Sequence, residues 1–336
     1  MPKRVIFEPH ALQYPLGEEL MRYFKGLKLP VSLTPSHNRV TSIPGRTRAE
    51  SYLEGKNTLV VGVRRTMKFE SCKPSAHYQL PLATSCPGRC EYCYLMTNLG
   101  EKPYVRVYVN IDEVLAAAKG YIEKRKPEIT IFEGAATSDP VPVELYTGAL
   151  KRAVEFFGRE DCGRFRFVTK FTDVDSLLGV EHNGKTRFRF SINTESVIKK
   201  YEHATPVLSA RLAAAKKVAG SGYPLGFLVA PIIATGGWQS DYRELFEKMA
   251  RVLNGAEENL TFEFITHRFT KRAKNTILEV FPETGLEMNE ESSTFKFGQF
   301  GYGKYVYPKE LFHEIKSHFT GLVDEFFPAA KIEYFV

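Results

Sequence analysis

Between residues 77 and 281, short apolar runs alternate with longer segments of helical periodicity. The runs are rich in β-branched and aromatic residues, which favours strands buried on both faces. These strands are expected at 77–84, 128–132, 164–170, 187–191, 225–233 and 260–265. The segments between them predict helices at about 111–126, 143–157, 174–178, 206–219, 241–253 and after 271. This alternation predicts an α/β fold in which a parallel sheet closes partly into a (β/α)6 barrel of the TIM type.

Local signals refine some of these elements. Asn110 and Glu113 have the spacing of a capping box at the start of the first helix. The sequence Arg-Phe-Arg-Phe occurs at 164–167 and again at 187–190, and its period of two gives each strand an aromatic face and a cationic face. The phenylalanines are expected to pack under helices. The arginines could either cover other surface with their stems or line a cavity.

The chain is expected to have three regions: an N-terminal extension at 1–75 packed on the barrel, the barrel at 76–281, and a C-terminal extension at 282–336. The first region has mixed character and many basic residues. In the third, alternation and glycines from 295 to 307 predict a β-hairpin, which is followed by a helix at about 309–326 and a strand at 330–335.

The predicted hairpin carries aromatic and basic side chains that could face a nucleic acid. Lysines neutralise phosphates, and aromatic rings stack on bases or wedge into a distorted duplex. The candidate DNA contacts are Lys296, Tyr302, Lys304 and Tyr305. An edge hairpin with aromatic cross-strand pairs is an equally good interpretation of the same residues.

Composition narrows the class of protein without naming a function. The chain has 336 residues, 43% hydrophobic and 25% charged, which excludes a disordered tail, a collagen-like fibre and a disulfide scaffold. The first residues lack the apolar core of a secretory signal, and the longest apolar stretch, near 225–234, is too short for a bilayer. We therefore expect a cytoplasmic protein with no membrane anchor. The net charge of +7 is compatible with a polyanionic partner.

Three of the five cysteines, Cys86, Cys90 and Cys93, fall within eight residues. A structural zinc site needs four ligands and usually builds them from two cysteine pairs, whereas this chain has one triplet, with His77 as a conceivable fourth ligand. Three thiolates on one short loop instead suit a 4Fe-4S cluster whose fourth iron stays open to bind another group. The triplet therefore favours cluster chemistry over zinc.

The CxxxCxxC spacing with Tyr92 directly before the last cysteine resembles the signature of the radical S-adenosylmethionine enzymes. The resemblance implies that the open iron binds S-adenosylmethionine and that its reductive cleavage yields a 5′-deoxyadenosyl radical. In barrels of this kind chemistry lies at the carboxyl ends of the strands. The polar side chains expected there are Ser138, Lys170, Ser191 and Asn193. Loop polarity or helix capping is the other interpretation of these residues.

Nearly the whole chain resembles the spore photoproduct lyase family. The segments that carry the resemblance are 86–94, 132–139, 166–171, 187–193, 301–307 and 331–335. The resemblance implies repair of 5-thyminyl-5,6-dihydrothymine in the DNA of bacterial spores, by hydrogen abstraction at carbon 6 and scission of the methylene bridge. It also implies duplex DNA as partner, a reductant such as a flavodoxin or ferredoxin, a monomer, and a place in the spore core.

The same resemblance implies roles for individual residues. The cysteine triplet would hold the cluster, and Tyr92 would lie along the adenine of S-adenosylmethionine. The amino-acid end of that cofactor would be bound by Ser138, Lys170 and Ser191. Tyr92 and Tyr94 are matched to tyrosines that take part in returning the hydrogen. Lys170 suits its role because an ammonium pairs with a carboxylate.

One position departs from the family pattern. Where the family has a hydrogen-donor cysteine, this chain has Ala136, whose methyl group cannot donate. The chain is either an engineered variant or a natural member that quenches the thymine radical by another route. Because the residues on both sides of Ala136 match the family pattern, the first alternative, replacement of the cysteine, is favoured. Cys72 and Cys162 are conceivable replacement donors, although ordinary buried thiols are the simpler interpretation.

Two other functions stay open: a radical enzyme acting on RNA or a small molecule, and a zinc-stabilised nucleic-acid-binding protein without enzyme activity.

Overall fold

The computed structural model describes residues 1–336 except 36, 38–39, 256–258, 298–300 and 302. It divides into two compact units, each built from several stretches of the chain. The first unit consists of Met1–Gly88, Asn98–Thr169 and Asp173–Arg187. The second consists of Arg89–Thr97, Lys170–Thr172 and Phe188–Val336. The division into extension, barrel and extension at 1–75, 76–281 and 282–336 stays a prediction.

The N-terminal part of the first unit is a five-stranded sheet that the sequence patterns did not predict. Its order is β2 (Val31–Leu33), β1 (Arg4–Phe7), β3 (Thr58–Gly62), β8 (Val105–Tyr108) and β6 (Ala83–Thr84). The first four strands are parallel, and β6 pairs antiparallel with β8. The connections include the 3-10 helix η1 (Pro9–Gln13) and the helices α1 (Pro15–Gly26) and α2 (Arg48–Lys56).

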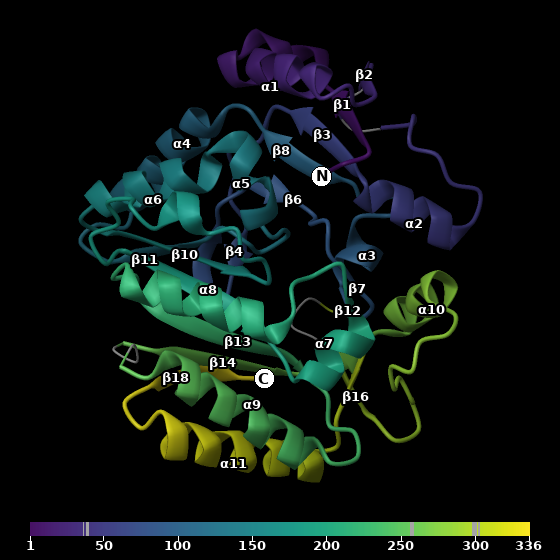
Figure 1. Ribbon diagram of the computed structural model, residues 1–336, viewed down its shortest axis with the longest axis vertical. Coiled ribbons are helices and arrows are strands. Elements are labelled where there is room, and N and C mark those ends of the chain that lie inside the picture. Colours follow the sequence, from purple (N-terminus) through teal and green to yellow (C-terminus); the bar gives the residue numbers. More distant parts are fainter. Residues whose placement is uncertain (36, 38–39, 256–258, 298–300, 302) are drawn as a thin grey trace. The chain divides into compact units, whose positions relative to one another are not determined.

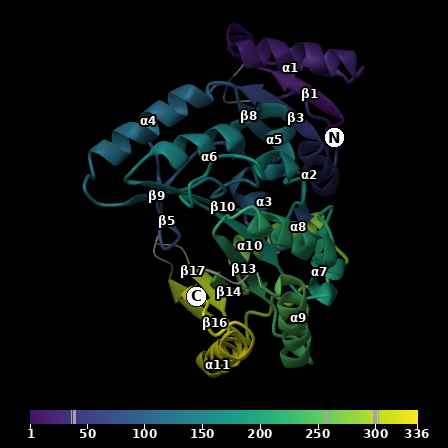
Figure 2. The same cartoon turned by 60° about the vertical axis from the view of Figure 1, so that its left-hand side comes forward.

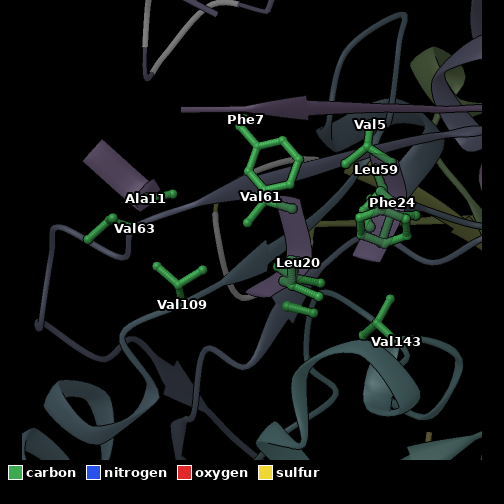
Figure 3. Packing of buried hydrophobic residues seen from close by; sticks show 13 residues of the cluster. Val5, Phe7, Ala11, Leu20, Phe24, Leu59, Val61, Val63, Val109 and Val143 are labelled. Carbon is green, nitrogen blue, oxygen red and sulfur yellow. The ribbon is translucent and has the colours of Figure 1, made fainter. Parts of the chain in front are cut away.

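Alternation along these strands builds the core on one face of the sheet. Val5 and Phe7 of β1 and Val61 of β3 are buried, and they belong to one cluster with Leu20 and Phe24 of α1 (Figure 3). Each strand thus places every second side chain under α1, as the period of two requires.

The rest of the first unit holds β4 (Ser71–Cys72), β5 (Ala76–Gln79), β9 (Thr130–Glu133) and β10 (Gly163–Thr169). Strands β5, β9 and β10 are parallel, and β4 pairs antiparallel with β5. The helices are α4 (Ile111–Glu123), α5 (Val141–Thr147) and α6 (Ala149–Arg159), with a 3-10 turn at η2 (Asp175–Leu177). Helices α4 and α6 run next to each other (Figure 2).

Three local predictions in this unit were wrong. The strand expected at 77–84 divides into β5 and β6, with Pro81 between them, because proline cannot donate to a strand ladder. The helix expected at 143–157 is two helices, α5 and α6, because Gly148 adopts a left-handed φ of 59°. Asn110 is the N-cap residue of α4 but makes no capping hydrogen bond, since its Oδ1 accepts from the backbone N–H of Arg64 instead.

The second unit contains most of β11 (Thr186–Ile192), from Phe188 on, and the strands β13 (Leu225–Ile232), β14 (Thr261–Thr266) and β18 (Lys331–Phe335), all parallel. Its longer helices are α8 (Leu208–Gly220), α9 (Trp238–Leu253), α10 (Lys271–Val280) and α11 (Lys309–Phe326). Helices α9 and α11 lie side by side (Figure 1). The predicted strands and helices of this region are confirmed with small shifts of their ends, and the short helix α7 (Glu195–Tyr201) was missed.

The predicted C-terminal hairpin is confirmed. Strand β16 (Thr294–Phe297) pairs antiparallel with β17 (Gly303–Val306), and β15 (Arg268–Phe269) pairs with the other edge of β17. Phe295 and Tyr305 are directly opposite, with ring centroids 5.3 Å apart, and so are Lys296 and Lys304. The aromatic pair stabilises the hairpin, and the two lysines share the other face. Tyr302 lies outside the described residues.

Both Arg-Phe-Arg-Phe strands have the predicted aromatic face. Phe165, Phe167, Phe188 and Phe190 are all buried. Two of the arginines, Arg166 and Arg189, are buried as well. Arg189 pairs with Glu263, at 2.6 Å between Nη1 and Oε2, and Arg166 donates to the carbonyl oxygen of Ser75. These arginines therefore bind acceptors of the protein itself.

Candidate active site

The cysteine triplet lies on the segment between β6 and the short helix α3 (Leu95–Asn98). Cys90 is buried in β7 (Arg89–Cys90), which pairs antiparallel with β12 (Glu202–His203). None of the five cysteines forms a disulfide. Among the described residues, no three His, Cys, Asp or Glu side chains are grouped as a metal ion requires. The assignment of the triplet to a cluster therefore rests on its spacing in the sequence.

A buried polar cluster in the second unit joins several of the predicted site residues. Lys170 lies directly after β10, and its Nζ is 2.9 Å from Oγ of Ser191 in β11. The same Nζ is 3.3 Å from the hydroxyl oxygen of Tyr92 and 2.9 Å from Oε1 of Glu202. The Tyr92 hydroxyl donates to Oε1 of Glu202. Lys170 thus contacts Tyr92 and Ser191, two other residues predicted to bind the same cofactor.

Glu202 is a member of this cluster that the sequence did not reveal. It follows α7, its side chain is fully buried, and its Oε2 is 2.6 Å from Nη2 of Arg211 in α8. Arg211 is itself fully buried and also donates to the carbonyl oxygen of Ser191. No sequence signal marks Glu202, because a glutamate after Lys199, Lys200 and Tyr201 is typical of an exposed helix end.

The cluster is held in defined charge states. Burial by itself would raise the pKa of Glu202, but the charges of Lys170 and Arg211 outweigh it and lower the pKa to about 2. Burial and the neighbouring Glu202 carboxylate raise the pKa of Tyr92 well above its ordinary value. Near neutral pH the cluster therefore contains a carboxylate, two cations and a protonated phenol.

In the first unit, two buried carboxylates fix the loop that carries Ala136 and Ser138. Glu133 accepts from the backbone N–H of Ala135 at 3.1 Å, and Asp139 accepts from Oγ1 of Thr169 at 2.8 Å. Oγ of Ser138 is buried and has no hydrogen-bond partner among the described residues. A buried hydroxyl without a partner in the protein can donate a hydrogen bond to a bound ligand or accept one from it.

The start of this loop requires glycine. A Cβ on Gly134 would lie 2.7 Å from Cζ of Phe165 and 3.3 Å from Cδ1 of Leu82. Phe165 and Leu82 are both buried, so neither can move aside freely.

Other predicted residues have different surroundings. Asn193 is fully buried, donates to the carbonyl oxygen of Pro231 and accepts from the Tyr242 hydroxyl, so it stabilises the end of β11. Tyr94 is 54% exposed. Nδ1 of His77, a conceivable zinc ligand, accepts from the backbone N–H of Ile131.

On the hairpin, the Tyr305 hydroxyl donates to Glu290 at 2.9 Å. Burial lowers the pKa of Lys304, and Arg268 and Lys296 act in the same direction.

Comparison with known proteins settles the family. The family model described as spore photoproduct lyase matches residues 1–336. The chain belongs to the spore photoproduct lyase family. It is 52% identical to the spore photoproduct lyase of Clostridium acetobutylicum, over 100% of this chain and 99% of that protein. It is 51% identical to the one of Bacillus subtilis, over 100% of this chain and 98% of that protein.

Solved structures of spore photoproduct lyase are equally similar. One is a double mutant with bound AdoMet and dinucleoside spore photoproduct, and another is a complex with the dinucleoside spore photoproduct. Each has a TM-score of 0.98 and 53% identity, and each match covers 100% of this chain and 99% of the other. The match confirms the predicted fold class, an α/β fold of the partial-barrel type. Within the described residues, no helix is both long and apolar enough to cross a membrane.

Proposed function

We propose that this member of the spore photoproduct lyase family reverses 5-thyminyl-5,6-dihydrothymine in DNA to two thymines, with S-adenosylmethionine and a 4Fe-4S cluster. The observation that carries the proposal is the contact of Lys170 with Tyr92 and Ser191, three residues that the family pattern assigns to one cofactor. Relatives with about half of their residues in common are solved with AdoMet and the dinucleoside lesion. When bound, the cluster and S-adenosylmethionine supply the 5′-deoxyadenosyl radical that takes hydrogen from carbon 6.

The residues present fit these groups. Cys86, Cys90 and Cys93 would hold the cluster, since thiolates are its usual ligands and three of them would leave the fourth iron open for S-adenosylmethionine. Ser138 offers a buried hydroxyl without a partner, and Lys170 offers a cation at a strand end. Ser138, Lys170 and Ser191 would bind the amino-acid end of S-adenosylmethionine, the ammonium of Lys170 facing its carboxylate. Glu202 and Arg211 would keep Lys170 in place.

Substrate repair would end differently here than in a relative with a hydrogen-donor cysteine. The substrate radical must receive a hydrogen atom before thymine forms, and Ala136 has none to give. Tyr92 and Tyr94 would return hydrogen to the cofactor, and the hydroxyl of Tyr92 donates a hydrogen bond to Glu202. We infer that hydrogen abstraction is retained and that formation of thymine is impaired.

The test is anaerobic turnover of a dinucleotide lesion with reconstituted cluster, dithionite and S-adenosylmethionine. Cleavage of S-adenosylmethionine is expected with this chain and with its Ala136→Cys variant, and clean thymine formation is expected to be much better with the variant. Equal thymine yields would contradict the role given to position 136. If S-adenosylmethionine were cleaved while the lesion stayed intact even with Ala136→Cys, an RNA or small-molecule substrate would be favoured. Zinc without iron and sulfide would exclude the proposed enzyme.

Partners and location follow from this function. The substrate would be a flipped-out lesion in duplex DNA, in contact with the hairpin that carries Lys296, Lys304 and Tyr305. Binding should weaken as salt rises, because phosphate contacts release counterions. A flavodoxin or ferredoxin would supply the electron, and the protein would act as a monomer in the cytoplasm of the spore core. Its barrel and two extensions would have the boundaries given above.

A further inference from the structure

A lysine of the first unit is buried beside Cys86, the first cysteine of the triplet. Lys56 is the last residue of α2 and only 3% exposed. Its Nζ donates to the carbonyl oxygen of Cys86 at 2.9 Å and lies 3.4 Å from Oγ of Ser85. Both acceptors are neutral. The sequence patterns gave no reason to single out Lys56, because it lies 30 positions before Cys86.

Lys56 has no counter-charge among the described residues, where no carboxylate lies within ion-pair distance of its Nζ. Two other deeply buried cations are paired, Arg189 with Glu263 and Arg211 with Glu202. The ring of Tyr52, 5.6 Å from Nζ, gives a weaker cation–π contact. A buried ammonium without an anion is unfavourable, so its presence points to an anion that binds next to it.

The backbone next to Lys56 is fixed. Ser85 is fully buried and has a left-handed φ of 65°. Its N–H donates to the carbonyl oxygen of Thr137, and its Oγ donates to that of Pro103, both at 2.8 Å. Cys86, the first cysteine of the triplet, therefore directly follows a residue that hydrogen bonds hold in place. The ammonium of Lys56 is accordingly kept beside the backbone of Cys86.

We propose that Lys56 supplies the counter-charge of the iron–sulfur cluster and raises its reduction potential. The inference rests on the proposed function, because it requires a cluster on the triplet. Reduction transfers one electron from a low-potential donor, which is oxidised, and adds a negative charge to a group already bound by three thiolates. A nearby fixed cation stabilises the reduced form more than the oxidised form.

The experiment is a redox titration of the anaerobically reconstituted protein, with the reduced cluster measured by electron paramagnetic resonance. Lys56→Met removes the charge and keeps an unbranched side chain of similar length. At a fixed applied potential, its ratio of reduced to oxidised cluster is expected to fall about tenfold, a shift of about 59 mV for one electron. Lys56→Arg should stay near the unaltered chain. Lys119→Met, which removes the charge of an exposed lysine, is the matched control and should change nothing.

Each outcome decides the proposal. An unchanged potential in Lys56→Met, with full iron and sulfide content, overturns it. If Lys56→Met binds no cluster, the result with Lys56→Arg decides. A cluster retained in Lys56→Arg supports the need for a positive charge at this position. A cluster lost in Lys56→Arg shows that hydrogen-bond geometry alone matters and overturns the proposal. Failure of the proposed function would be seen separately: without a cluster the unaltered chain would take up no iron and sulfide, and with another substrate the lesion would stay intact while the titration was unaffected.

Discussion

Glu202→Gln is expected to destabilise the second unit by about 3 kcal/mol at neutral pH. The substitution keeps the shape of the side chain but removes the charge shared by Lys170 and Arg211, which are mostly or fully buried. Lowering the pKa of Glu202 from 4.5 to about 2 corresponds to about 3 kcal/mol, at 1.36 kcal/mol for each pH unit. Loss of one partner from other buried ion pairs has an effect of similar size.

The pH dependence has a defined sign. The pKa of Glu202 is lowered by folding, so its contribution is complete above pH 4.5 and is lost as the pH falls toward 2. The difference between the unaltered chain and Glu202→Gln should therefore be constant from pH 7 to about 5.5. Because Glu202 of the unfolded chain takes up a proton near its ordinary pKa, this difference in unfolding free energy should be smaller by about 1 kcal/mol at pH 4. Urea unfolding monitored by circular dichroism at several pH values measures both quantities.

A matched control is Glu325→Gln. Glu325 pairs with Arg243 on the surface, where both side chains are nearly half exposed, and an exposed pair contributes at most about 1 kcal/mol. The reasoning is refuted if Glu202→Gln destabilises no more than this control, or if its effect is the same at pH 4 as at pH 7.

Further predictions concern the two units separately. Gly134→Val should destabilise the first unit by about 1–3 kcal/mol in urea unfolding, because its Cβ would overlap Phe165; an unfolding curve like that of the unaltered chain would show that the loop can move. Burial lowers the pKa of His267 to about 4, so stability should fall by about 2 kcal/mol from pH 7 to pH 5, and His267→Gln should remove most of that slope. Lys170→Met should weaken S-adenosylmethionine binding about tenfold in equilibrium dialysis, as expected for loss of one charge-assisted hydrogen bond; unchanged affinity would exclude Lys170 from the site.

Several helices and strands could be predicted from local pattern alone. The helix at 309–326 has the predicted bounds, and the strands predicted at 164–170 and 187–191 differ from the observed strands by one residue at each end. Periodicity is a property of neighbouring residues, so it can be read without the fold. Lys170 and Ser191, both expected at the carboxyl ends of strands, are in contact. The cysteine triplet and the family pattern are recognised from the spacing of residues along the chain, without the fold.

Only the tertiary structure revealed the partners of these residues. Glu202 and Arg211 are 32 and 41 positions from Lys170, and no repeat or motif connects them. The N-terminal sheet, with β1 between β2 and β3, and the approach of Lys56 to Cys86 also depend on which distant segments pack together. Burial then decides the effect of these charges, since an ammonium or a carboxylate removed from water is screened less and acts more strongly on nearby groups. The sequence therefore predicted candidate residues for the site, and packing revealed the charged groups that contact some of them.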